Sequence, residues 1–349
     1  MAEDPRKDAG EDWPAVARHL AAHGMRLTDP PPHRFPGGLA NRNYLIHLDS
    51  GPAVLRRPPP GPLPPGAHDM AREHRILSRL TDALPVAPRS LHLCEDATVM
   101  GAPFQILEYR PGRVIRATLP DDLAGQAAAL SEIMVTTLAA IHAVDTAALG
   151  LDTLGRPQGF LARQVAGWRR RGLAVAGPDA TPLLEELGTW LNRQPLPDAP
   201  PTLLHGDFKL DNIILAPDLL GNDLRPAAVV DWDQGTRGDP LFDLATLLSY
   251  WTEPGDPPSM HALQQMPTAA PGFLTREQAA LRYAALTGRD LTGFRVHRVL
   301  AILKLGVIFL QLGALWRTGA ATDRRYAGFA TVGAGVLAFG TDVSGGCVF

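Results

Sequence analysis

The chain has 349 residues, with 33 Lys and Arg against 36 Asp and Glu and a formal net charge of -3. This length exceeds one average domain and suits either one large domain or two joined lobes. The near balance of charge lacks the basic excess of nucleic-acid-binding proteins, so no nucleic-acid partner is expected.

The two cysteines, Cys94 and Cys347, stand far apart in the sequence, with no CxxC pattern and no histidine cluster beside them. The sequence therefore predicts neither a disulfide framework nor a zinc site. The first residues lack the apolar segment of a secretory signal. A reducing, cytoplasmic location is expected.

Up to about residue 113, the sequence contains several short strand-like runs and few helical stretches. Apolar spacing predicts a helix over Trp13–His23, and proline excludes Pro58–Pro65 from a central strand, so this stretch is expected to be a loop. Residue type and turn signals predict strands at 43–48, 53–56, 90–94 and 104–107 and a main helix at 69–80.

Beyond residue 114 the pattern becomes mainly helical, interrupted by short strands. Helices are predicted at 122–144, 181–192, 241–251, 276–286, 294–316 and 323–339, and strands at 212–215 and 227–230. The longest apolar run, Val299–Trp316, contains Lys304 and Gln311 and is short for a bilayer, so a buried core helix is expected rather than a membrane span.

The chemistry is concentrated in two acidic motifs, His205-Gly206-Asp207 with Asn212, and Asp231 at the end of an apolar strand. Phosphoryl transfer needs a carboxylate that takes or orients the proton of the attacking hydroxyl, and Asp207 is the candidate for that catalytic base. It also needs oxygen ligands for Mg²⁺, which Asn212 and Asp231 supply. Each motif alone could be an ordinary turn or strand cap. Their order and spacing favour a phosphotransferase.

These motifs resemble those of the aminoglycoside phosphotransferase family, relatives of the protein kinases. His205–Asn212 is similar to the kinase catalytic loop, and Asp231 to its metal-binding Asp. The block Gly238–Ala245 is similar to the family's Gly-Asp-Pro-x-x-Asp-Leu-Ala, which implies that Asp243 holds the catalytic loop. Within the family, Val54–Gly61 and the helix around Lys304 are most similar to phosphotransferase domains that precede an acyl-CoA dehydrogenase.

The resemblance implies an α+β, protein-kinase-like two-lobed fold, with a small β-rich N-lobe carrying one main helix and a larger, mainly helical C-lobe. The expected division is a tail and helix at 1–30, a nucleotide-binding lobe with hinge at 31–113, and a helical lobe with catalytic loop, metal site and acceptor cleft at 114–349. The expected donor is ATP or GTP with Mg²⁺.

The nucleotide site is then expected in the smaller lobe. The pair Gly37 and Gly38 would let the backbone turn close to phosphates, because glycine has no Cβ to obstruct the approach. Arg56 takes the place of the usual kinase Lys with Glu73 as its partner, and Arg57 is expected to face solvent from the opposite side of the strand. Glu108 and Tyr109 lie in a hinge whose backbone would bind the purine. The expected nucleotide-binding residues are Gly37, Gly38, Ala40, Asn41, Arg56, Glu73, Glu108 and Tyr109.

Lys209, two residues after Asp207, is a candidate catalytic residue that neutralises the transferring phosphoryl group; the alternative is an exposed surface lysine. Asp211 and Asp233 are further acids near the motifs. Both are interpreted as structural, with an added metal contact as the alternative for Asp233.

The acceptor is the least determined part. Residues 261–349 hold nine Lys and Arg against four Asp and Glu, a difference of +5, whereas a polycationic aminoglycoside would prefer an acidic cleft. A neutral or anionic hydroxyl compound is expected, and the relatives suggest a hydroxyacyl-CoA-like thioester; a solvated basic face is the alternative. Other functions left open are an aminoglycoside or macrolide phosphotransferase, an inactive kinase-like nucleotide-binding module, and a structural interaction protein.

Overall fold

The computed structural model describes residues 11–36, 41–59, 68–216, 224–321 and 323–349. The chain divides into two compact units. The first unit is Met1–Gly112 with Ala227–Gly235, and the second unit is Arg113–Pro226 with Thr236–Phe349. The division predicted from the sequence has three continuous segments. In the structure, by contrast, the first unit also includes Ala227–Gly235, a segment that comes late in the chain.

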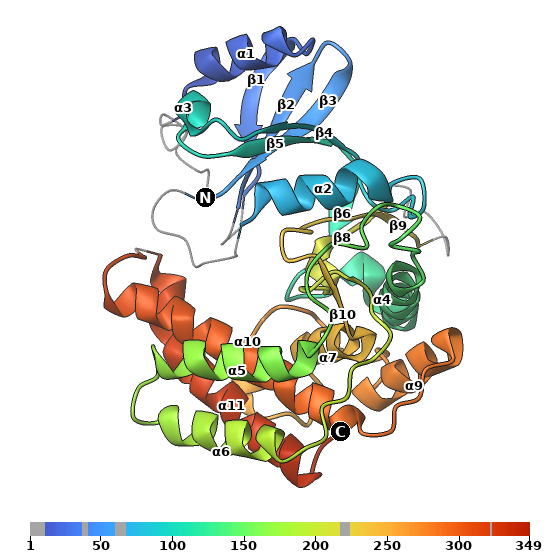
Figure 1. Cartoon of the computed structure of the whole chain (residues 1–349), viewed down its shortest axis with the longest axis vertical. Coiled ribbons are helices and arrows are strands. Elements are labelled where there is room, and N and C mark those ends of the chain that lie inside the picture. The colour runs from blue at the N-terminus through green and yellow to red at the C-terminus, as the bar shows by residue number, and fades with distance from the viewer. Residues whose placement is uncertain (1–10, 37–40, 60–67, 217–223, 322) are drawn as a thin grey trace. The chain divides into compact units, whose positions relative to one another are not determined.

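A five-stranded antiparallel sheet forms the centre of the first unit (Figure 1). Its order is β1-β2-β3-β5-β4. The strands are β1 (Leu27–Arg34), β2 (Arg42–Leu48), β3 (Gly51–Arg57), β4 (Ser90–Cys94) and β5 (Phe104–Glu108). The predicted strands β2 to β5 are confirmed, and β2 and β3 pair from Leu48 opposite Gly51 at the turn.

Strand β1 was not predicted because it contains Pro30, Pro31 and Pro32. Its position at the sheet edge explains how they fit, since an edge strand needs only one row of backbone hydrogen bonds. The pairing with β2 also shifts register between Thr28 and His33.

Helices α1 (Trp13–Ala22) and α2 (Met70–Leu80) lie on opposite faces of this sheet (Figure 1). Both were predicted, and each begins at an Asp whose side chain caps a backbone N–H, Asp12 for α1 and Asp69 for α2. A short helix, α3 (Ala97–Met100), lies between β4 and β5 in the chain.

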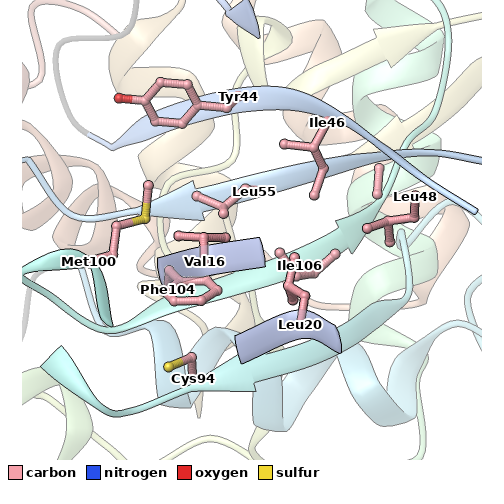
Figure 2. Packing of buried hydrophobic residues seen from close by; sticks show 11 residues of the cluster. Val16, Leu20, Tyr44, Ile46, Leu48, Leu55, Cys94, Met100, Phe104 and Ile106 are labelled. Atoms are coloured by element: carbon pink, nitrogen blue, oxygen red, sulfur yellow. The ribbon is translucent and has the colours of Figure 1, made fainter. Parts of the chain in front are cut away.

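Val16 and Leu20 of α1 pack against the sheet in a buried apolar cluster (Figure 2). The strand residues of this cluster alternate along each strand, as a sheet with one face toward α1 requires. They are Tyr44, Ile46, Leu48, Ala53, Leu55, Cys94, Phe104 and Ile106, joined by Met100.

The same alternation on β3 turns Arg56 toward α2 and Arg57 toward the α1 face. Arg56 contacts Glu73 of α2, whereas Arg57 is buried and forms an ion pair with Glu11. The expectation that Arg57 faces solvent is wrong. The alternation of side chains along β3 correctly predicted that Arg57 lies on the face opposite Arg56. That face is covered at Arg57 by Glu11, which precedes α1 in the chain.

The second unit is mainly helical, as predicted. Its main helices are α4 (Ala127–His142), α5 (Phe160–Leu173), α6 (Thr181–Asn192), α7 (Pro240–Tyr250), α9 (Arg276–Thr287), α10 (Phe294–Arg317) and α11 (Phe329–Gly345), with a short α8 (Pro258–His261). The sequence did not predict helices α5 and α8. Short 3₁₀ helices precede α4 at Asp121–Gln126 and α11 at Arg324–Gly328.

Helix α10 packs against α5, α6, α7 and α11. Among the described residues, three helical stretches are long and apolar enough to cross a membrane, judged by length and composition alone: Asp121–His142, Phe294–Arg317 and Arg324–Gly345. In the apolar window of α10, 67% of the residues are buried, and Arg298 and Lys304 are buried with them. That α10 is a core helix remains a prediction, which this burial supports.

Short strands frame the predicted catalytic loop within the second unit. Strand β7 (Thr202–Leu204) pairs with β10 (Thr236–Gly238), and β6 (Arg113–Val114) pairs with β8 (Ile213–Leu215). The loop runs from β7 to β8 and closes with a 3₁₀ turn at Leu210–Asn212, so Asn212 precedes the strand in which it was predicted. The predicted strand before Asp231 is β9 (Pro226–Val229).

Candidate active site

In the first unit, the buried guanidinium of Arg56 is surrounded by carboxylates. Its Nε donates to Glu73 Oε2 at 2.8 Å, its Nη2 donates to Asp231 Oδ1, and Nη2 lies 3.9 Å from Asp233 Oδ2. Burial opposes the charge, but Asp231, Glu73 and Asp233 together raise the pKa of Arg56 above its ordinary value. Arg56 is therefore a fixed cation held by three acids.

Glu73 joins four segments of this unit. Its carboxylate accepts hydrogen bonds from Arg56, from Gln105 Nε2, and from the backbone N–H of Trp232 at 2.9 Å. Burial raises the pKa of Glu73, and the Arg56 guanidinium opposes that rise. The side chain thus ties α2 to β3, to β5 and to the acidic segment after β9.

That acidic segment presents Asp231 and Asp233. Asp231 has a backbone φ of 73°, in the left-handed region that Asp adopts more readily than most residues. Asp233 is buried, and its Oδ2 accepts a hydrogen bond from Asn41 Nδ2 at 3.1 Å. Burial and the neighbouring Asp231 raise the pKa of Asp233 to about 8. Three carboxylates around one guanidinium leave an acidic excess that suits a bound cation.

Of the other residues predicted to bind the nucleotide, only some of those described lie in this cluster. Asn41 lies in this cluster, with its Oδ1 2.9 Å from His68 Nδ1. Glu108 ends β5, where its side chain pairs with Arg110 and its N–H donates to the carbonyl oxygen of Arg89 at 2.8 Å. Tyr109 follows, half-buried. The predicted Gly37, Gly38 and Ala40 lie outside the described residues.

In the second unit, the Asp207 carboxylate is held by two donors. Oδ1 accepts the Tyr250 hydroxyl at 2.8 Å, and Oδ2 lies 3.2 Å from Lys209 Nζ. Burial first, and Asp207 second, raise the pKa of Tyr250 well above its ordinary value, so the phenol stays protonated and donates. Lys209 also lies 3.8 Å from Asp211 Oδ1 and 3.4 Å from Gln265 Oε1. Lys209 is half-buried rather than an exposed surface lysine.

The backbone around Asp207 is fixed from several sides. Asp243 accepts the N–H of His205 at 2.7 Å and that of Gly206 at 2.9 Å, which is the loop-holding contact that the sequence resemblance implies. Asn212 Nδ2 donates to the Asp207 carbonyl at 2.8 Å, which leaves Oδ1 as the acceptor atom of this amide. The Lys304 ammonium donates to the Gly206 carbonyl.

Sequence reasoning missed Tyr250 and gave Lys304 no role. A signal for Tyr250 existed: Asp243 and Tyr250 are spaced i, i+7 on α7, so both lie on one face of the helix. Lys304 could not be placed in this way, because its helix is apolar on nearly all sides. Burial lowers the pKa of Lys304, while Asp207 and Asp243 oppose that change.

Comparison with known proteins relates most of the chain to one family. The model of the phosphotransferase enzyme family matches residues 31–282. The mouse protein acyl-CoA dehydrogenase family member 10 is 34% identical over 280 residues, which cover 78% of this chain and 26% of that protein. The chain therefore corresponds to about a quarter of this relative.

Solved structures show the same fold. A candidate aminoglycoside phosphotransferase from Ralstonia eutropha superposes with a TM-score of 0.77 at 25% identity, covering 96% of this chain and 99% of that one. A thermostable mutant of aminoglycoside phosphotransferase APH(4)-Ia, in a ternary complex with AMP-PNP and hygromycin B, has a TM-score of 0.58 at 17% identity, covering 93% and 99%. The predicted kinase-like α+β fold is confirmed.

Proposed function

We propose a function that starts from one premise: this chain belongs to the phosphotransferase enzyme family. The proposed reaction moves the γ-phosphoryl group of ATP or GTP to a hydroxyl group of a small molecule. AMP-PNP in the complex of a protein with this fold supports a nucleoside triphosphate as donor. The observation that carries the proposal is the Asp207 carboxylate, oriented by Tyr250 and Lys209 on a loop that Asp243 holds.

Asp207 is the proposed base. Because each of its oxygens has a donor nearby, the carboxylate has a fixed direction. It would accept or orient the proton of the attacking hydroxyl, while the ammonium of Lys209 offsets negative charge on the transferring group. Lys304 fixes the carbonyl of Gly206, the residue before Asp207, and so keeps the loop in place.

The donor nucleotide is assigned to the first unit. Arg56, held by Glu73, is the proposed cation for the nucleotide phosphates, with Asn41, Glu108, Tyr109 and the stretch containing Gly37, Gly38 and Ala40 as further predicted contacts. The Glu108 N–H is already used by Arg89, so the remaining backbone groups near Tyr109 would meet the purine. ATP and GTP both fit this description.

Asp231 and Asn212 are the residues that would hold Mg²⁺. Their carboxylate and amide oxygens are the ligand types this ion prefers, and the acidic excess beside Asp231 favours a cation there. When bound, Mg²⁺ would offset the charge of the β- and γ-phosphates.

The charge balance of residues 261–349 favours a neutral or anionic acceptor, with nine Lys and Arg against four Asp and Glu. At the loop itself, Lys209 and the buried Lys304 lie beside Asp207, Asp211 and Asp243, whose charges offset theirs. The basic excess of residues 261–349 would repel a polycationic aminoglycoside. The similarity to a protein named as an acyl-CoA dehydrogenase family member supports a hydroxyacyl-CoA-like thioester as the specific candidate.

The test of the reaction is release of ADP or GDP that depends on Mg²⁺ and on an acceptor, measured over panels of metabolites and hydroxyacyl-CoA thioesters. Asp207→Asn should lose at least about 100-fold in turnover, since general base catalysis contributes about 10²- to 10⁴-fold. Thermal protection by nucleotide should persist in this variant. Asp179→Asn, an exposed acid in the same unit, is the matched control. Full turnover by Asp207→Asn would overturn the proposed base.

The acceptor class has a separate test. Hydroxyacyl-CoA thioesters, hygromycin B, kanamycin and a macrolide would be compared by kcat/KM under the same conditions. The expected order places the thioester first. Turnover of an antibiotic at the highest kcat/KM would refute the anionic acceptor and leave the phosphotransferase assignment standing, whereas protection by nucleotide with no turnover on any acceptor would favour an inactive binding module.

A further inference from the structure

Three histidines that are separate in the sequence meet at the end of α1. His19 lies in α1, His23 caps its C-terminus, and His92 lies in β4. One ring nitrogen of each lies within 4.8 Å of those of the other two. We propose that His19, His23 and His92 form a binding site for a divalent transition-metal ion of the zinc class, separate from the residues assigned to phosphoryl transfer.

The ring positions fit three imidazoles around one ion. The ring centroids are 4.4 Å apart for His19 and His23, 4.7 Å for His23 and His92, and 5.1 Å for His19 and His92. With Zn–N bonds of about 2.0–2.1 Å and tetrahedral angles, the centroids of three bound rings lie about 5 Å apart. The facing Nε2 atoms of His19 and His92 are 2.9 Å apart, so small side-chain rotations would bring the nitrogens to a shared ion.

The backbone already orients one of these rings. His23 Nδ1 lies 2.8 Å from the carbonyl oxygen of His19, which can only accept, so Nδ1 carries the proton. The lone pair of His23 is then on Nε2. Metal-binding histidines commonly donate their other ring N–H to a carbonyl group in this way, which fixes both the tautomer and the ring direction. The i, i+4 spacing puts His19 and His23 on the same side of the helix.

The charge state of the rings also suits a metal. Burial, His23 and His19 lower the pKa of His92 to about 4, and burial and His23 lower the pKa of His19. Both rings are therefore neutral near pH 7, which is the form that binds metal. Imidazole nitrogen binds zinc, copper and nickel ions more readily than Mg²⁺, because Mg²⁺ prefers oxygen ligands. This site would therefore not compete for the Mg²⁺ that accompanies the nucleotide.

Cys94 is not one of the proposed ligands. Its buried thiol lies 4.0 Å from Nδ1 of His19, on the ring nitrogen that faces away from His92, and burial raises its pKa. Three protein ligands leave a fourth tetrahedral position for water or another small ligand. A bound ion would join the end of α1 directly to β4, in addition to the apolar contacts of Val16 and Leu20.

The test uses the full chain without a histidine tag, freed of metal by a chelator. Zn²⁺ would be titrated calorimetrically, and Co²⁺ would be followed by its visible absorption, which is intense when coordination is tetrahedral. We expect one ion per chain, a higher Tm with Zn²⁺, and no displacement by millimolar Mg²⁺. None of these readouts depends on phosphotransferase activity.

The variants are His23→Ala and His92→Ala, with His261→Ala as the control. His23 is exposed, so its removal should leave the fold intact, and His261 is an exposed histidine of the second unit. Each site variant should weaken Zn²⁺ binding at least about tenfold, because removing even a residue that only hydrogen-bonds to a metal ligand costs about 10- to 100-fold in affinity. Zn²⁺ should then no longer raise the Tm of either variant. Unchanged Zn²⁺ affinity in His23→Ala, or no binding by the parent chain, would overturn the site.

Discussion

The carboxyl group of Asp233 illustrates how much a single residue depends on its neighbours. It is buried, accepts a hydrogen bond from Asn41, and lies beside Asp231 and Glu73, while the Arg56 guanidinium opposes the effect of their charge. Buried charges are retained at a cost unless they are paired or bind a cation. Without a bound cation, this cluster should favour one protonated carboxyl group, which makes Asp233 a probe of the proposed metal site.

Asp233→Asn should stabilise the metal-free protein at neutral and alkaline pH. The folded pKa of about 8 lies above the ordinary value of 3.8, so the stability that this bound proton contributes is fully present below about pH 4 and is lost as pH rises from there to about 8. The parent chain should lose up to about 1.4 kcal/mol of unfolding free energy per pH unit in this window. Thermal unfolding from pH 5 to 9 would measure it. Asp179→Asn should retain the slope, and an unchanged slope in Asp233→Asn would contradict the assignment.

At the scale of elements, two helices of the second unit fix the catalytic loop. Helix α7 brings Asp243 to the backbone of the loop and Tyr250 to the Asp207 carboxylate, two turns apart on one face. Helix α10 brings a buried ammonium, Lys304, to the carbonyl of Gly206. Burying this charge is costly, so its position is better explained by positioning the loop than by stabilising the fold.

Lys304→Met should separate these two roles. Methionine fills a similar volume but removes the ammonium and its hydrogen bond to Gly206. We expect an unfolding free energy that is unchanged or higher, and turnover lower by roughly tenfold or more, since a hydrogen bond to a charged group is worth about 1.5–3 kcal/mol. Melting curves and kcat would be measured in parallel, with Arg317→Met, an exposed cation on α10, as control. A loss of activity that merely followed a fall in Tm would argue for a structural role.

For the whole molecule, the main feature is that the chain returns to its first unit. Ala227–Gly235 belongs with Met1–Gly112 although more than a hundred residues of the second unit intervene. Hydrogen bonds to the backbone of this segment include Val229 N–H to the Val86 carbonyl, Trp232 N–H to Glu73, and Arg72 to the Asp233 carbonyl. The predicted metal ligand Asp231 therefore shares a compact unit with Arg56.

Hydrogen exchange should reveal this arrangement. Binding of ADP with Mg²⁺ should slow exchange in 227–235 together with β3 and α2, because ordering of the proposed nucleotide site would act on all three. In Asp231→Ala, the part of this protection that requires Mg²⁺ should disappear, while Asp179→Asn should behave as the parent chain. Protection confined to the second unit would refute the assignment of the nucleotide to the first.

Much of the fold could be predicted from local signals. The hairpin of β2 and β3, the capped helices α1 and α2, and the long helices after residue 114 follow from hydrophobic period, turn residues and caps. Strand β1 could not be predicted, because its three prolines argue against a strand unless its place at the sheet edge is known. Proposed roles for Gly37, Gly38 and Ala40, and the cytoplasmic location, remain predictions.

The sequence by itself predicts the class of chemistry, because the order and spacing of Asp207, Asn212 and Asp231 are typical of phosphoryl transfer. Tertiary structure alone decided which side chains meet. Tyr250 on Asp207, Glu73 on Trp232, Glu11 on Arg57, and His92 beside His19 and His23 all join segments far apart in the chain. The physical reason is that period and propensity act over a few residues, whereas pairing of buried charges and convergence of ligands depend on how whole elements pack.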